Sequence, residues 1–159
     1  TIPLKDHEDV SSFKLFMLDC GLLGALSNTP PVSLLLPSDM KEGKGSLTEN
    51  FVCTQMETLP NATITYFSRD DSQLEIDFVV QLSDRILPIE VKAEENLKAK
   101  SLITFVRSHP GLHGFRFSMS DYREQDLLTN VPLYASAVYL KDLMEKRQKD
   151  IDRMLAGLI

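Results

Sequence analysis

Hydrophobic residues recur at helical spacing in three stretches of the chain. The first begins at Ser46 and predicts a helix that ends near Pro60, and the second, 98–108, is followed by the stop signal His109-Pro110-Gly111. The third, 141–158, predicts an amphipathic helix whose charged residues form a solvated face. Its apolar stripe consists of Leu143, Met144, Ile151, Met154, Leu155 and Leu158.

Runs with alternating or β-branched and aromatic residues predict the strands of a sheet. These runs are 13–19, 63–67, 74–82, 86–92, 115–119 and 135–140. In 74–82, strict alternation puts Ile76, Phe78, Val80 and Leu82 on one face and Asp77 on the other. A tight connection at 83–85 joins this strand to the next. Helix, three strands, helix, two strands and helix in this order predict an α/β or α+β sandwich around a mixed sheet.

The beginning of the chain is less regular. Residues 1–12 are polar and are interpreted as an arm, and 21–26 predict a short helix. Residues 27–45 contain three prolines and two glycines, which indicates a long irregular connection. We therefore divide the chain into an arm with this connection (1–44), a core (45–140) and a C-terminal helix (141–159).

Composition narrows the possible classes of protein. With 159 residues, 43% of them hydrophobic, the chain has enough apolar material for one domain with a core. Its net charge of −6 disfavours a basic nucleic-acid coat protein but leaves room for a nucleic-acid enzyme with a local basic patch. No apolar run is long enough to span a membrane. The isolated cysteines favour reduced thiols and a cytoplasmic location, and the opening Thr1-Ile2-Pro3 suggests a piece of a longer protein.

The candidate chemistry lies at Asp77 and at Glu90-Val91-Lys92. Period two in a strand places Glu90 and Lys92 on one face, about 6.5–7 Å apart along the backbone. Counting back from the turn at 83–85 brings Asp77 near Glu90 on the neighbouring strand. Two carboxylates beside an ammonium group suit Mg²⁺ or Mn²⁺, because such hard cations take oxygen ligands and leave positions for water and phosphate.

Each of these residues also has a purely structural interpretation. Glu90 and Lys92 are compatible with a weak ion pair on a solvated strand, although a central strand would make buried charges costly unless they are paired or bound to metal. Ser46 and Glu49 match a capping box at the start of a helix. This capping box alone explains Glu49; the functional interpretation adds a third carboxylate directed at the same metal, and the sequence does not separate the two.

Four blocks in this order resemble the PD-(D/E)XK nuclease-like domain. They are Gly45-x-x-x-Glu49-Asn50-Phe51-Val52, Glu75-Ile76-Asp77-Phe78-Val79, Pro88-Ile89-Glu90-Val91-Lys92 and Lys100-Ser101-Leu102. More narrowly, the chain is similar to the uncharacterised domain at the C-terminal end of many prokaryotic AAA-type ATPases. The stretches 13–23 and 130–134 also look like that family, so the resemblance covers roughly residues 13–140.

The resemblance implies a restriction-endonuclease-like core, with a mixed central sheet flanked by helices. It implies that Asp77 and Glu90 bind the metal, that Lys92 orients the attacking water and that Glu49 is an accessory carboxylate. Lys100 and Ser101 would then lie beside the site and contact substrate. The missing partner would be the N-terminal ATPase domain, because this chain has no G-x-x-x-x-G-K-[ST] motif.

Two functions remain open at this stage. The first is metal-dependent hydrolysis of phosphodiester bonds in DNA, for which Lys92, Lys98, Lys100 and Arg107 would supply a local positive rim. The second is a catalytically silent module that binds DNA or protein on behalf of the ATPase half. The acidic net charge favours the second, since nonspecific binding of nucleic acid depends on cations. The sequence leaves strandedness and oligomeric state undefined.

Overall fold

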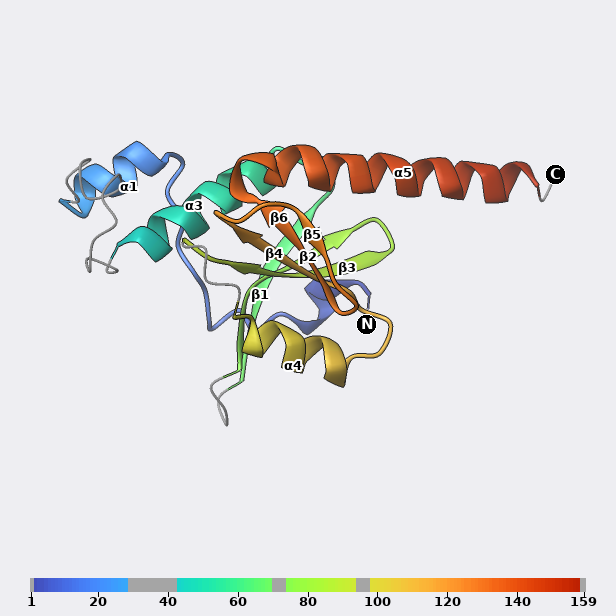
Figure 1. Ribbon diagram of the computed structural model, residues 1–159, viewed down its shortest axis with the longest axis horizontal. Helices are drawn as coiled ribbons and strands as arrows, with labels where there is room; N and C mark the ends of the chain where they lie inside the picture. The colour runs from blue at the N-terminus through green and yellow to red at the C-terminus, as the bar shows by residue number, and fades with distance from the viewer. Residues whose placement is uncertain (1, 29–42, 70–73, 94–97, 158–159) are drawn as a thin grey trace.

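A mixed six-stranded sheet with helices on both faces forms the centre of the computed structural model, which describes residues 2–28, 43–69, 74–93 and 98–157 (Figure 1). The described helices are η1 (Leu4–His7), α1 (Cys20–Leu26), α3 (Lys44–Met56), α4 (Lys100–Ser108), η2 (Leu133–Ala135) and α5 (Ser136–Ala156). The strands are β1 (Thr63–Ser68), β2 (Glu75–Leu82), β3 (Arg85–Val91), β4 (Gly114–Ser118), β5 (Arg123–Glu124) and β6 (Leu128–Pro132). The α/β class predicted from the sequence is confirmed.

The strand order is β1-β2-β3-β4-β6-β5. The first three strands are antiparallel, whereas β3, β4 and β6 run parallel and β5 is antiparallel to β6. A two-residue turn at Ser83-Asp84 joins β2 to β3, and Ser83 adopts a φ of 53° there. The parallel step from β3 to β4 needs a crossover, which α4 provides. The predicted hairpin and crossover are therefore both present.

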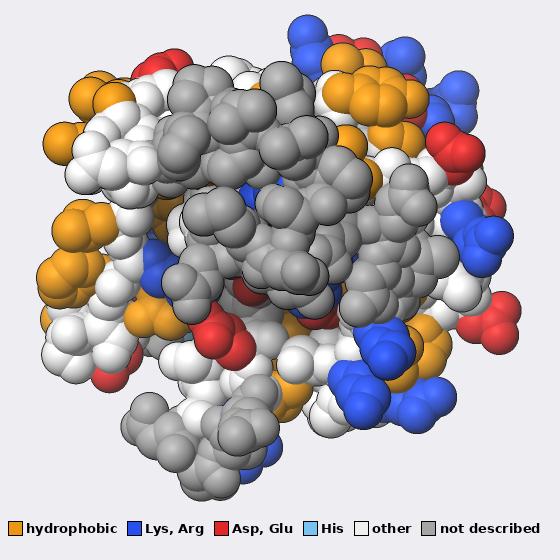
Figure 2. Space-filling view, turned by 60° about the vertical axis from the view of Figure 1, so that its left-hand side comes forward, with side chains coloured by type: hydrophobic (Ala, Val, Ile, Leu, Met, Phe, Trp, Pro, Cys, Tyr) orange, Lys and Arg blue, Asp and Glu red, His pale blue; other side chains and the backbone are white. Residues whose placement is uncertain are grey.

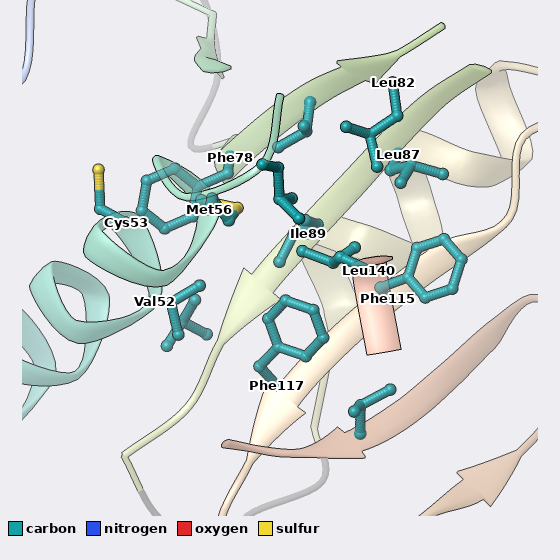
Figure 3. Packing of buried hydrophobic residues seen from close by; sticks show 14 residues of the cluster. Val52, Cys53, Met56, Phe78, Leu82, Leu87, Ile89, Phe115, Phe117 and Leu140 are labelled. Atoms are coloured by element: carbon teal, nitrogen blue, oxygen red, sulfur yellow. The ribbon is translucent and has the colours of Figure 1, made fainter. Parts of the chain in front are cut away.

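Two hydrophobic clusters cover the two faces of the sheet. On one face α3 and α5 pack on the sheet through Val52, Met56 and Leu140, which are fully buried (Figure 3). On the other face α4 packs through Leu102, Phe105 and Val106. Figure 1 shows the three layers, α3 with α5, the sheet and α4, and the two hydrophobic clusters lie between them. No helix in the described part of the chain has both the length and the apolar composition of a membrane span.

One residue of β2 interrupts the predicted alternation. Thr65 of β1 pairs with Val79 of β2, and Phe67 pairs with Ile76. Between these two pairs β1 has one residue and β2 has two, so the register shifts. This β-bulge at Asp77 and Phe78 reverses the facing of the residues before it. Ile76 therefore packs in the cluster on the α4 side, and its predicted place on one face with Phe78, Val80 and Leu82 is wrong.

The predicted strand at 13–19 is wrong. Residues 12–17 have no regular secondary structure, and Asp19 is the N-cap of α1. At Met17 the backbone N–H and C=O bond with the side-chain amide of Asn50 in α3, at 2.7 and 3.1 Å. A side chain thus satisfies the polar groups that a neighbouring strand would satisfy in a sheet. The predicted short helix at 21–26 is confirmed as α1, and most of the irregular connection at 27–45 lies outside the described residues.

The predicted strand at 135–140 is also wrong. It forms η2 and the first turn of α5, because Ser136, Leu140 and Leu143 continue one helical stripe. The last strand of the parallel set is instead β6, whose five residues are all buried, Thr129 and Asn130 included. Only the first part of the C-terminal stripe is covered. Leu140 is fully buried, whereas Met154 and Leu155 are 61% and 55% exposed.

Candidate functional site

The hairpin of β2 and β3 brings Asp77 beside Glu90. Phe78 faces Ile89 in the last β2–β3 pair, so Asp77 and Glu90 are the next residues beyond it. The Asp77 Oδ2 atom accepts a hydrogen bond from the backbone N–H of Val91 at 2.7 Å. The bulge in β2 occurs at this point, and bulges are frequent where a strand redirects a side chain at a site. The predicted proximity of these two carboxylates is thus present in the fold.

Glu90 has one paired and one unpaired carboxylate oxygen. Lys92 Nζ lies 2.6 Å from Glu90 Oε1, and the lysine side chain is 36% exposed. Glu90 is only 7% exposed, and its Oε2 atom is buried without a hydrogen-bond partner. A buried carboxylate oxygen without a donor is energetically costly. This oxygen therefore has an acceptor position that no described group fills.

A third carboxylate, Glu49 on α3, interacts electrostatically with Asp77 at this hairpin. Burial raises the pKa of Asp77, the hydrogen bond from Val91 lowers it, and the charge of Glu90 raises it further. Burial also raises the pKa of Glu49, and the next largest cause is the charge of Asp77. Burial is the largest cause of both shifts, and a nearby carboxylate adds to each, because neighbouring carboxylates disfavour each other's ionised form.

Glu49 does not take part in a capping box. The N-cap of α3 is Gly43, with a φ of 97°, and it makes no side-chain capping bond. Ser46 is the third residue of the helix, so the predicted Ser46–Glu49 capping box is wrong. The helix begins before Ser46 because a glycine readily adopts the positive φ that the turn into α3 requires. Glu49 is half-buried on α3, and helix capping does not account for it.

Lys14 is a member of this site that the sequence did not reveal. Its Nζ atom lies 2.7 Å from Glu75 Oε1, two residues before Asp77 in β2, and 5.2 Å from the centroid of the Tyr66 ring. Burial lowers the pKa of Lys14, but the bond to Glu75 and the charges of Glu75, Glu49 and Asp77 raise it overall. No sequence signal links Lys14 to a carboxylate more than sixty positions away, so only the fold identifies it.

A buried polar row extends from Glu90 across the sheet. Arg116 faces Glu90 in the β3–β4 register, and Asn130 faces Arg116 in the β4–β6 register. Arg116 is 1% exposed and its Nε donates to Asn130 Oδ1 at 2.8 Å. Burial lowers the pKa of Arg116, and the charge of Glu90 counteracts that shift. Glu90 thus has two nearby cations, Lys92 just after its own strand and Arg116 on the next strand.

The predicted substrate residues Lys100 and Ser101 are the first two residues of α4. Lys100 is exposed and Ser101 is half-buried. Figure 2 shows acidic and basic side chains close together on the side of the molecule turned forward there. In the described part of the chain, no three His, Cys, Asp or Glu side chains group closely enough to hold a metal ion. The candidate ligands are therefore the two carboxylates of Asp77 and Glu90, and Glu49 is a nearby carboxylate that the charge of Asp77 affects.

Comparison with known proteins gives one match. A family model described as a domain of unknown function (DUF4143) matches residues 44–135, more than half of the chain. That range includes Glu49, Asp77, Glu90, Lys92 and Arg116, whereas Lys14 lies before it. No curated protein and no solved structure matches the chain.

Proposed function

The chain belongs to the DUF4143 family of domains of unknown function, and we propose that this domain is a metal-dependent nuclease that hydrolyses phosphodiester bonds in DNA. The observation that carries the proposal is the buried, unpaired Oε2 of Glu90 beside Asp77. A carboxylate pair with a free oxygen fits Mg²⁺ or Mn²⁺, which proteins usually hold with one or two carboxylates while water and substrate phosphate complete the shell.

The residues divide into ligands and a water-orienting group. Asp77 and Glu90 would hold the metal, which when bound stabilises charge on the phosphoryl oxygens and lowers the pKa of bound water. Lys92 is close enough to Glu90 to orient a water molecule at the same point, and its partial exposure leaves it accessible to substrate. Glu49 adds negative charge from α3, and Lys100 and Ser101 would contact the nucleic acid from the start of α4.

The arrangement of the strands supports the same proposal. An antiparallel β1-β2-β3 unit, followed by a crossover helix and the parallel strands β4 and β6, agrees with a restriction-endonuclease-like core. Asp77 lies near the start of β2, Glu90 lies near the end of β3, and Lys92 follows β3 directly. The proposed partner is an N-terminal AAA-type ATPase domain in a longer protein, which the sequence resemblance suggests.

Cleavage assays with matched variants test the proposal. Double- and single-stranded DNA are incubated with the protein and Mn²⁺ or Mg²⁺, and with EDTA as the metal-free control. Asp77→Asn, Glu90→Gln and Lys92→Met should each lower the cleavage rate about 100-fold or more, the scale of a lost acid–base or ligand group. Asp142→Asn and Lys146→Met change an exposed ion pair on α5 and should leave the rate unchanged. Equal cleavage by wild type and the three site variants would refute the nuclease assignment.

One observation favours a second candidate, a catalytically silent module that binds the ATPase half. Lys14 and Lys92 already pair with Glu75 and Glu90, so these charges have a structural use without a metal. Calorimetry separates the two candidates. Heat of Mn²⁺ binding that Glu90→Gln abolishes supports the nuclease, whereas binding to the ATPase half without any metal heat supports the module.

A further inference from the structure

An extended segment near the N-terminus crosses the two elements that carry Glu49 and Asp77. We call residues 14–17 the crossing segment. Met17 bonds through its backbone to Asn50, the neighbour of Glu49 on α3. The ring of Phe16 packs on the ring of Phe78, the neighbour of Asp77 on β2, with centroids 5.4 Å apart. The crossing segment is thus fixed to both sides of the carboxylate site.

Lys14 is the charge that this segment carries to the site. Phe16 and Met17 are anchored next to Asp77 and Glu49, and Lys14 reaches Glu75 two positions before Asp77. Its side chain is 24% exposed, and the Tyr66 ring lies on another side of it. A half-buried ammonium group that faces a carboxylate and an aromatic ring is held in place on the protein.

We infer that Lys14 is the built-in counter-ion of the carboxylate site and that it sets the affinity of this site for divalent cations. The inference rests on the proposed function, since it concerns the same pair, Asp77 and Glu90. A fixed positive charge at the site repels a second cation and reduces the negative potential that attracts it. In the protein without metal, the same charge relieves the repulsion among Glu49, Glu75 and Asp77.

The inference predicts tighter metal binding when the charge is removed. Lys14→Met keeps the apolar part of the side chain and should increase the affinity for Mn²⁺, measured by titration calorimetry, about fivefold or more. A change of this size is the order of effect expected when one unit charge near a divalent cation is removed in a solvent-screened environment. Lys14→Arg retains the charge and should bind Mn²⁺ like wild type. Lys146→Met removes a lysine from the exposed pair on α5 and should also bind like wild type.

The outcomes distinguish this inference from the proposed function. If Asp77→Asn weakens Mn²⁺ binding but Lys14→Met does not strengthen it, the inference is overturned and the nuclease proposal is unaffected. If Asp77→Asn binds Mn²⁺ as wild type does, or if no variant binds it, both are overturned. Binding by Lys14→Met where wild type shows none supports the inference in its strongest form. Circular dichroism establishes that each variant is folded, and Lys14→Gln replaces Lys14→Met if the latter is not.

Discussion

The carboxylate of Asp77 accepts the backbone N–H of Val91 from the neighbouring strand. Regular β2–β3 pairing ends at Phe78 and Ile89. Beyond that pair, the Asp77 side chain in place of the β2 backbone accepts the hydrogen bond from β3. The bond fixes the position of Asp77 relative to β3, which carries Glu90 and is followed directly by Lys92. Asp77 consequently has a structural role in addition to any chemical one.

Two substitutions of Asp77 should therefore distinguish its structural role from a role in chemistry. Asp77→Ala leaves the N–H of Val91, which is 6% exposed, without an acceptor and should lower the free energy of unfolding by about 1–3 kcal/mol. Asp77→Asn keeps an acceptor oxygen and should unfold within about 1 kcal/mol of wild type. Urea denaturation in EDTA measures both. A loss of stability in Asp77→Asn as large as in Asp77→Ala would contradict this role.

Glu49→Gln should stabilise the protein at neutral pH. The pKa of Glu49 is raised in the fold by burial and by Asp77, so the folded state binds more protons than the unfolded state as pH rises through the window above the unfolded pKa. Stability falls as pH rises through that window, so the cost of ionising Glu49 in wild type is larger above the window than below the unfolded pKa. The gain in Tm for Glu49→Gln should shrink as pH is lowered towards about 4, where the unfolded carboxyl is largely protonated.

Two controls accompany this measurement. Glu145→Gln removes an exposed carboxylate from α5, and its Tm should stay close to that of wild type at each pH in the same range. Ser46→Ala should change the free energy of unfolding by less than about 0.5 kcal/mol, because Ser46 does not cap α3. A Glu49→Gln protein less stable than wild type at pH 7 would show that this carboxylate has a structural partner.

Asn130 supports the buried polar row, so its removal should be costly. Its Oδ1 accepts from Arg116 Nε and from Ser118 Oγ, and its Nδ2 donates to two backbone carbonyls. Asn130→Ala should lower the free energy of unfolding by about 3 kcal/mol or more, since it leaves buried polar groups without partners. Guanidinium denaturation measures the change. A loss below about 1 kcal/mol would mean that water replaces the amide at little cost.

Substitutions in the first and last parts of α5 should differ in their effect on stability, because only the first part is buried. Leu140→Ala removes a fully buried side chain from the cluster that α3, α5 and the sheet share, and should cost about 2–5 kcal/mol. Met154→Ala changes a side chain that is 61% exposed and should cost less than about 0.5 kcal/mol. Thermal unfolding of the two variants side by side compares them. Equal losses would show that the far part of α5 is covered in solution.

Local patterns predicted most of the elements that lie between β1 and β4. Alternation and turn residues identified the hairpin of β2 and β3, and periodicity identified α4 and the stop at His109. These signals work because the apolar residues follow the period of the element, or form a short continuous run where both faces are buried, as in β3. From them followed the proximity of Asp77 and Glu90, the central feature of the candidate site.

The sequence failed where a long-range contact decides the structure. β6 lacks alternation because both of its faces are buried and its polar residue Asn130 finds partners in β4 and in the loop after it. The segment at 13–19 has strand composition, but the amide of Asn50 takes its backbone bonds. The bulge in β2 and the position of Lys14 likewise depend on neighbours far away in the chain.

The tip of the β2–β3 hairpin is joined to α5. Arg147 donates from Nε to Asp84 Oδ1 at 2.9 Å and from Nη2 to Asp84 Oδ2. Asp77 and Glu90 lie at the opposite end of the same hairpin, so this ion pair links the C-terminal helix to the end of the hairpin that is far from the carboxylates. Shortening the chain before Arg147 would therefore remove this link at the hairpin turn while Asp77, Glu90 and Lys92 stay in the chain.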